Sequence, residues 1–190
     1  MKPIFALSLL ILSVAGQVNN TKSCPSELTK GFEFPHLIIP IDSEAPDVAR
    51  GTSYNGKITP TVSSIFNFDI PSAININQTL TCSLWFLFPE RNYRFSGDGL
   101  VKFSRLEAPA TLVTSYANAP AVQEELQIAT LVPGRKYNVT NFECPAGQAI
   151  SFRLDNAGST ELDYFQDYNE PPDGLIEGYC PRIGLYITKC

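Results

Sequence analysis

Apolar and polar side chains alternate along most of the chain in short runs, and this period of two is typical of β-strands with one buried face. In the run 61–70, Phe66 and Phe68 fall on one face and Asn67 falls on the other. Pro, Gly and Asn fill the breaks between the runs and favour turns there. The clearest of the predicted strands are 36–41, 61–70, 81–88, 100–106, 126–132, 150–154 and 185–190.

Run 81–88 is apolar on both faces, which predicts a central strand covered on two sides and places Trp85 in the core. A short helix is predicted at 121–125. With about eight or nine short strands between turns, the pattern predicts an all-β fold, a single antiparallel β-sandwich of the jelly-roll or immunoglobulin-like kind.

The first residues have the pattern of a secretory signal peptide. Lys2 precedes an apolar run, and the small residues Val14 and Gly16 precede the expected cleavage point at Gln17. The run is shorter than the roughly 20 apolar residues that cross a bilayer, which favours a cleaved signal over an anchor. We therefore expect a secreted protein, extracellular or held in a cell wall, with no membrane insertion.

No internal repeat or linker divides the rest of the chain. The expected organisation is a signal peptide at 1–16, a lead-in segment at 17–31 and one sandwich domain at 32–190. The formal net charge is −5 and there is no cluster of Lys and Arg, which argues against nucleic acid and anionic membranes as partners.

Export gives the five cysteines a role, because cysteines pair in an oxidising compartment. One of the five is left over, and fifteen arrangements remain open from the counts alone. There is no Cys-x-x-Cys pair and a single histidine, so a zinc site is not expected. Asn19, Asn77 and Asn138 each begin an Asn-x-Thr acceptor for N-glycosylation, which requires export and exposure.

Candidate catalytic residues are sparse. His36 enters a predicted strand, and no Gly-x-Ser-x-Gly elbow supplies a serine for a triad, so a structural role is expected for this histidine. A glycosidase needs two convergent carboxylates, and the alternative is that these acids are solvated near strand ends. The acids considered are Asp42, Asp47, Asp69, Glu90, Asp155 and Asp163.

The segment 155–177 holds seven acidic residues and neither Lys nor Arg. Because calcium prefers several oxygen ligands, Asp155 and Asp163 are weak candidates for a calcium site, although the spacing matches no known calcium loop. Otherwise no cofactor is expected.

Three aromatic residues lie in the same acidic segment: Tyr164, Phe165 and Tyr168. Sugar rings stack on aromatic faces while Asp, Asn and Gln bind their hydroxyls, so these residues could form a shallow glycan platform. The alternative is that two of the three are core residues of an edge strand.

Segments in a fixed order together resemble the fungal But-two C-terminal domain family, from about residue 32 to 190. They are FPHLIIPID (34–42), GTSYNG (51–56), VSSIFNFDIP (62–71), CSLWFLFP (82–89), FSG (95–97), CPAGQ (144–148), YFQDYN (164–169) and GLYI (184–187). The resemblance implies a small secreted fungal protein, often of cell-surface or wall context, with no assigned catalytic residues. The family's name derives from binding of an activating enzyme of a ubiquitin-like modifier, a cytosolic or nuclear partner that an exported chain would not meet.

The resemblance also suggests a disulfide assignment. Four cysteines match the family, and we expect Cys24 to pair with Cys190 and Cys82 to pair with Cys144 across the core. The insert at 173–182 departs from the family and brings in Cys180 as the odd cysteine.

These observations predict a non-enzymatic extracellular binding or surface protein, associated with glycans such as a cell-wall polysaccharide. One alternative is a secreted effector or elicitor that acts on a host extracellular protein, and another is a glycoside-active enzyme.

Overall fold

The computed structural model describes residues 28, 31–72, 80–90, 93–166 and 182–190. All regular structure in these residues is β-strand. The strands are β1 (Phe32–Glu33), β2 (Leu37–Asp42), β3 (Asn55–Ile58), β4 (Val62–Asp69), β5 (Thr81–Phe88), β6 (Tyr93–Ser96), β7 (Leu100–Leu106), β8 (Val122–Thr130), β9 (Arg135–Glu143), β10 (Ala149–Asn156), β11 (Glu161–Phe165) and β12 (Gly184–Lys189).

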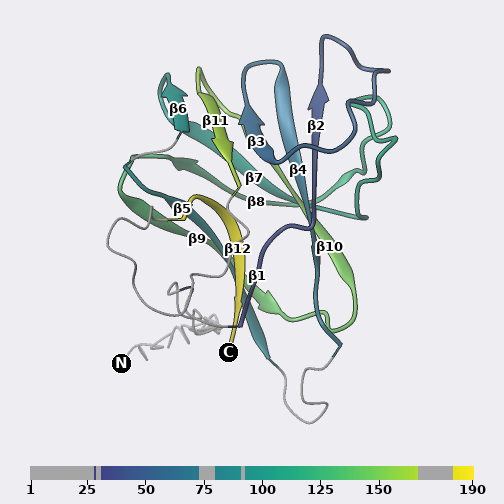
Figure 1. Cartoon of the computed structure of the whole chain (residues 1–190), viewed down its shortest axis with the longest axis vertical. Helices are drawn as coiled ribbons and strands as arrows, with labels where there is room; N and C mark the ends of the chain where they lie inside the picture. The colour runs from purple at the N-terminus through teal and green to yellow at the C-terminus, as the bar shows by residue number, and fades with distance from the viewer. Residues whose placement is uncertain (1–27, 29–30, 73–79, 91–92, 167–181) are drawn as a thin grey trace, which may run out of the picture.

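The strands form three antiparallel sheets. A four-stranded sheet has the order β1-β12-β5-β9, a five-stranded sheet has the order β2-β4-β10-β7-β8, and a three-stranded sheet has the order β3-β11-β6. Figure 1 shows the three-stranded sheet at the end of the molecule opposite the C-terminus. The prediction of an all-β, sandwich-like fold of antiparallel sheets is confirmed.

The main core lies between the sheets and is filled by the inward side chains of all three. Phe86 and Leu185 enter it from the four-stranded sheet, Phe66 and Phe152 from the five-stranded sheet, and Tyr164 from the three-stranded sheet. Aromatic edge-to-face contacts recur in this core, as aromatic rings prefer. The rings of Phe86 and Tyr164, for example, lie 5.7 Å apart at an interplanar angle of 79°.

The outer face of the five-stranded sheet is covered by the connection from β7 to β8. Ile39, Ile65 and Ala110 form a second buried cluster there. The amide of Asn67, on the same face of β4, donates to the Ala110 carbonyl at 2.8 Å and accepts from its N–H at 3.1 Å. This contact satisfies both backbone groups of Ala110 and fixes the connection on the sheet.

Two expectations from the pattern are corrected. The helix predicted at 121–125 is wrong, because Val122–Thr130 forms β8, the edge strand beside β7. The register of that pair shifts twice, and each irregularity interrupts the alternation that would mark a strand in the sequence. The described residues also hold twelve strands rather than eight or nine.

The predicted central strand is confirmed, since β5 pairs with β12 on one side and β9 on the other. Trp85 is only half-buried and lies on the face of this sheet that points away from the main core. It packs there against the cluster of Phe32, Leu87 and Tyr186, and its indole N–H donates to the Thr188 hydroxyl at 3.1 Å.

The structure contains the disulfide between Cys82 and Cys144. It does not cross the sandwich as expected: Cys82 lies on β5 and Cys144 directly follows β9, the neighbouring strand of the same sheet. Cys190 is also disulfide-bonded. Cys24, its expected partner, and Cys180 lie outside the described residues.

Tyr164 presents a testable property of the core. Its hydroxyl is buried without a hydrogen-bond partner among the residues that the structure describes, and leaving a hydroxyl unsatisfied costs about 1–3 kcal/mol. We expect Tyr164→Phe to raise the free energy of unfolding by about 1 kcal/mol at pH 7. Urea unfolding of the two proteins measures this difference, and a less stable variant would contradict it.

The same substitution should change the response to alkaline pH. Burial raises the pKa of Tyr164 well above its ordinary value, with a smaller contribution from Tyr186. Above about pH 10 the unfolded chain ionises this phenol and the folded protein does not, so the native protein loses stability as pH rises. Tyr164→Phe removes this loss, and its advantage should therefore be larger at pH 10.5 than at pH 7.

Candidate binding site

The outer face of the three-stranded sheet is the part of the structure that most resembles a binding surface. Along β11, Leu162 and Tyr164 point into the core, so Asp163 and Phe165 point outward. Asp163 lies opposite Lys57 of β3 on one side and opposite Arg94 of β6 on the other. The result is a row of alternating charges across three strands.

Asn55 completes the polar part of this face. Its side-chain amide donates to the Asp163 carboxylate at 2.7 Å. Asn55, Arg94 and Asp163 line an open hollow of about 450 Å³ together with Tyr93, Tyr164 and Phe165, and we call it the polar pocket. It offers a carboxylate, an amide and a guanidinium side by side.

An exposed pair of aromatic rings borders the polar pocket. The rings of Tyr54 and Phe165 lie 6.4 Å apart at an interplanar angle of 30°. Tyr54 is 72% exposed and Phe165 is 46% exposed. Exposed aromatic pairs are uncommon because folding normally buries such rings. We call Tyr54, Phe165 and the outward polar residues of the sheet the platform.

Tyr54 also lines a second hollow, and we call it the groove. It measures about 280 Å³ and is lined by Phe34, Pro35, His36, Leu37, Ile38, Thr52, Ser53, Tyr54 and Gln166. Apolar side chains and the tyrosine ring provide most of its wall, and His36 and Ser53 supply polar atoms.

His36 is oriented by a carboxylate. Its Nδ1 lies 3.2 Å from an oxygen of Asp69, the last residue of β4. A carboxylate accepts hydrogen bonds, so it favours the proton on Nδ1 and leaves Nε2 of the neutral ring as an acceptor. Both side chains are substantially exposed, so this histidine is a surface residue at the edge of the groove.

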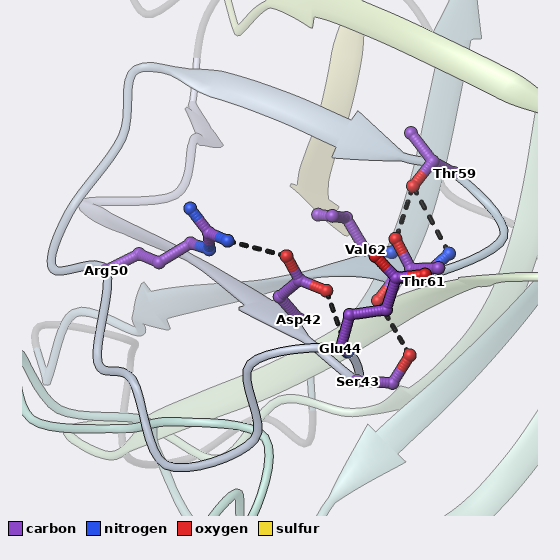
Figure 2. A network of polar contacts seen from close by, with 7 residues as sticks. All are labelled: Asp42, Ser43, Glu44, Arg50, Thr59, Thr61 and Val62. Carbon is purple, nitrogen blue, oxygen red and sulfur yellow. Dashed lines mark hydrogen bonds and ion pairs between the residues drawn. The ribbon is translucent and has the colours of Figure 1, made fainter.

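The connection from β2 to β3 carries Thr52, Ser53 and Tyr54 into the groove, and a polar network holds its start (Figure 2). The Asp42 carboxylate accepts from the Glu44 N–H at 3.0 Å and from the Arg50 guanidinium at 2.6 Å. These two donors, the N–H first, hold the pKa of Asp42 below its ordinary value. The carboxylate therefore stays ionised and keeps Arg50 in place.

Strand β11 is fixed at both ends. At its start, Asp98 accepts from the Ser159 N–H at 3.1 Å and from the Thr160 hydroxyl at 3.0 Å. At its end, the Gln166 amide accepts from the Leu185 N–H at 2.9 Å and donates to the Leu185 carbonyl at 3.1 Å. The Gln166 amide thus makes the two hydrogen bonds to Leu185 that a neighbouring strand would make with its backbone, and it ties the platform to β12.

The glycan platform predicted from sequence is partly corrected. Phe165 is exposed as a platform residue must be, whereas Tyr164 is 1% exposed and forms part of the core, as the alternative interpretation expected of some of these aromatics. Tyr168 lies outside the described residues. Sequence reasoning missed Tyr54, although a tyrosine between Ser53 and Asn55-Gly56, in a turn-like polar stretch, is an available signal.

The two calcium candidates have other partners and lie on different sheets. Asp155 accepts from the Ser63 hydroxyl at 2.6 Å and from Arg153 at 2.9 Å, while Asp163 faces two cations across the strands. Among the described residues, no group of three or more His, Cys, Asp and Glu side chains is placed to hold a metal ion.

Several carboxylates considered for glycoside hydrolysis are engaged with non-carboxylate partners. Asp42 pairs with Arg50, Asp69 with His36, Asp155 with Arg153 and Asp163 with Asn55.

Of the glycosylation candidates, Asn138 is a half-buried residue of β9, and its amide donates to Asn141 at 3.0 Å. Asn19 and Asn77 lie outside the described residues.

The fold and this surface define a β-sandwich protein with an exposed aromatic and polar platform, an arrangement typical of binding modules.

A family model described as the ubiquitin 3 binding protein But2 C-terminal domain matches residues 33–170, and the chain belongs to this family. The family is named for binding. No curated protein matches the chain significantly. No helix in the described part of the chain is long and apolar enough to cross a membrane.

Proposed function

We propose that the chain is a secreted, non-catalytic binding protein that recognises glycans on its platform. The observation that carries the proposal is the exposed ring pair of Tyr54 and Phe165 beside the polar pocket. Sugars present apolar C–H faces and polar hydroxyl edges, so they fit a surface where aromatic rings adjoin paired donors and acceptors. Asp163 and Arg94 supply an acceptor and a donor at this place.

The extracellular location rests on the signal-peptide pattern at 1–16 and is supported by the disulfide chemistry. Disulfides persist in oxidising compartments, and the Cys82–Cys144 bridge joins two adjacent strands. The family description names ubiquitin 3 as a bound partner. An exported chain would not meet a cytosolic partner, so we carry over the binding role and propose a cell-wall polysaccharide as the ligand.

An apolar loop supports a second candidate, an effector that binds a host extracellular protein. The connection between β7 and β8 carries no charged residue from 108 to 121, and it exposes 60% of Leu112 and 71% of Val113. The Thr114 hydroxyl and the Asn118 amide accept hydrogen bonds within the loop and hold its shape. Exposed apolar side chains that lie together can mark a protein-binding surface.

A pair of matched double variants tests the platform. Tyr54→Ala with Phe165→Ala should weaken pull-down on insoluble chitin or β-glucan at least about fivefold, since the two stacked rings together contribute about 1–3 kcal/mol. Leu112→Ala with Val113→Ala removes two exposed apolar side chains elsewhere and should leave pull-down unchanged. All four side chains are substantially exposed, so both variants should fold.

Unchanged pull-down by the Tyr54 and Phe165 variant would contradict glycan recognition on the platform. Expression timing distinguishes the second candidate. A gene induced only during host colonisation, with a loss of host-protein binding in the Leu112 and Val113 variant, would favour the effector.

A further inference from the structure

We infer that the platform prefers glycans built from N-acetylated sugars, and that the groove receives an acetamido group. This inference rests on the proposed function and adds the chemical class of the ligand. It starts from the relation of the two hollows. Tyr54 lines the groove, Phe165 lines the polar pocket, and their rings lie 6.4 Å apart. A sugar chain that covers both rings therefore reaches both hollows.

The two hollows differ in chemistry. The polar pocket presents Asn55, Arg94 and Asp163, which suit hydroxyl groups. The groove presents apolar walls from Phe34 and Leu37 among others. A hydroxyl placed against these walls would lose its hydration without a partner, which is unfavourable. The substituent that enters the groove should therefore have an apolar part.

An acetamido group combines a methyl, an N–H donor and a carbonyl acceptor, and the groove matches each of them. The walls can cover the methyl. Because Asp69 binds Nδ1 of His36, Nε2 of the neutral ring can accept from the acetamido N–H. Ser53 Oγ already accepts from the Asn55 N–H at 2.9 Å, so its own O–H can donate to the acetamido carbonyl.

Charge supports the same ligand. Among the described residues that line the groove, only His36 and Tyr54 have ionisable side chains, and no Lys, Arg, Asp or Glu side chain is among them. Gln166 is occupied, because both ends of its amide bind the Leu185 backbone. The groove therefore suits a neutral substituent better than the carboxylate of an acidic sugar or the ammonium of an amino sugar.

Two hexasaccharides test the inference on the full mature protein. Chitohexaose and cellohexaose share the β-1,4 linkage and differ only at C2, where one has an acetamido group and the other a hydroxyl. Titration calorimetry should give chitohexaose at least about tenfold tighter binding, from burial of one methyl and formation of one hydrogen bond. His36→Ala removes the hydrogen bond but keeps the apolar walls, so it should lower this ratio to about fourfold, the share of one buried methyl. Leu112→Ala should leave the ratio unchanged.

The possible outcomes separate the two proposals. Equal binding of the hexasaccharides, or tighter binding of cellohexaose, would overturn the acetamido preference. Glycan recognition would still stand if Tyr54→Ala with Phe165→Ala removed that binding. A tenfold ratio that persists in His36→Ala would overturn the assignment of the groove. No binding of either hexasaccharide by the native protein would overturn both proposals.

Discussion

Replacing both cysteines of the β5–β9 bridge, as Cys82→Ala with Cys144→Ala, should lower the free energy of unfolding by about 5 kcal/mol. The bridge closes a loop with a sequence separation of 62 residues. In the chain-entropy model, opening a loop of this length returns about 4 kcal/mol of conformational freedom to the unfolded chain. Both residues are replaced together, because a lone thiol could pair with another cysteine.

Chemical denaturation with and without reductant separates the bridge from the packing of the sulfur atoms. Cys82 is fully buried, so the variant also loses about 1 kcal/mol of packing. In reducing buffer the native protein lacks the bridge too, and the difference between the two proteins should fall to that packing loss. A difference below about 1 kcal/mol without reductant would show that the bridge contributes little.

Adding one methyl group beneath the platform, by Gly56→Ala, should cost about 3 kcal/mol of unfolding free energy. A methyl group at Gly56 would overlap Cζ of Tyr164. The tyrosine ring is enclosed in the core against Phe86 and cannot swing away as a flexible side chain would. The strand β3 must therefore move outward, which also separates Tyr54 from Phe165 and should weaken glycan binding.

A double-mutant cycle with Tyr164→Ala assigns this cost to the ring. If the clash causes it, Gly56→Ala should cost close to nothing in the Tyr164→Ala background, which gives a coupling energy of about 3 kcal/mol. Lys57→Ala on the same strand is the control and should change stability by less than about 0.5 kcal/mol, because its side chain is exposed. Equal costs of Gly56→Ala in both backgrounds would reject the clash.

The sequence was most informative where one face of a strand is strictly apolar. The strand β4 was predicted because Phe66 and Phe68 repeat at a period of two. The strand β10 was predicted because Ile150, Phe152 and Leu154 do the same. The strand β9 was missed because it is an edge strand whose outward positions are polar and whose register is interrupted by a bulge. In β8 two such irregularities made an edge strand look like a short helix.

The site was harder to predict because it is assembled by sheet pairing. Phe165 was predicted as a platform residue from its own segment, whereas Tyr54 becomes its neighbour only when β3 pairs with β11. The Asn55–Asp163 contact joins residues that are 108 positions apart, and no local pattern indicates such a contact. The burial of Tyr164 also depends on this pairing, since Gly56 leaves the space that its ring occupies.

Because the polar part of the platform lies on strands, its outward residues alternate with inward ones. Lys57, Asp163 and Arg94 can each be exchanged while Ile58 and Leu162 continue to hold the core. The outward positions that face a ligand under the proposed function and the inward positions that hold the core are therefore separate positions of the same short segments. Mutation can explore new ligands at little cost in stability, and the same scaffold offers a starting point for selecting binders to other surfaces.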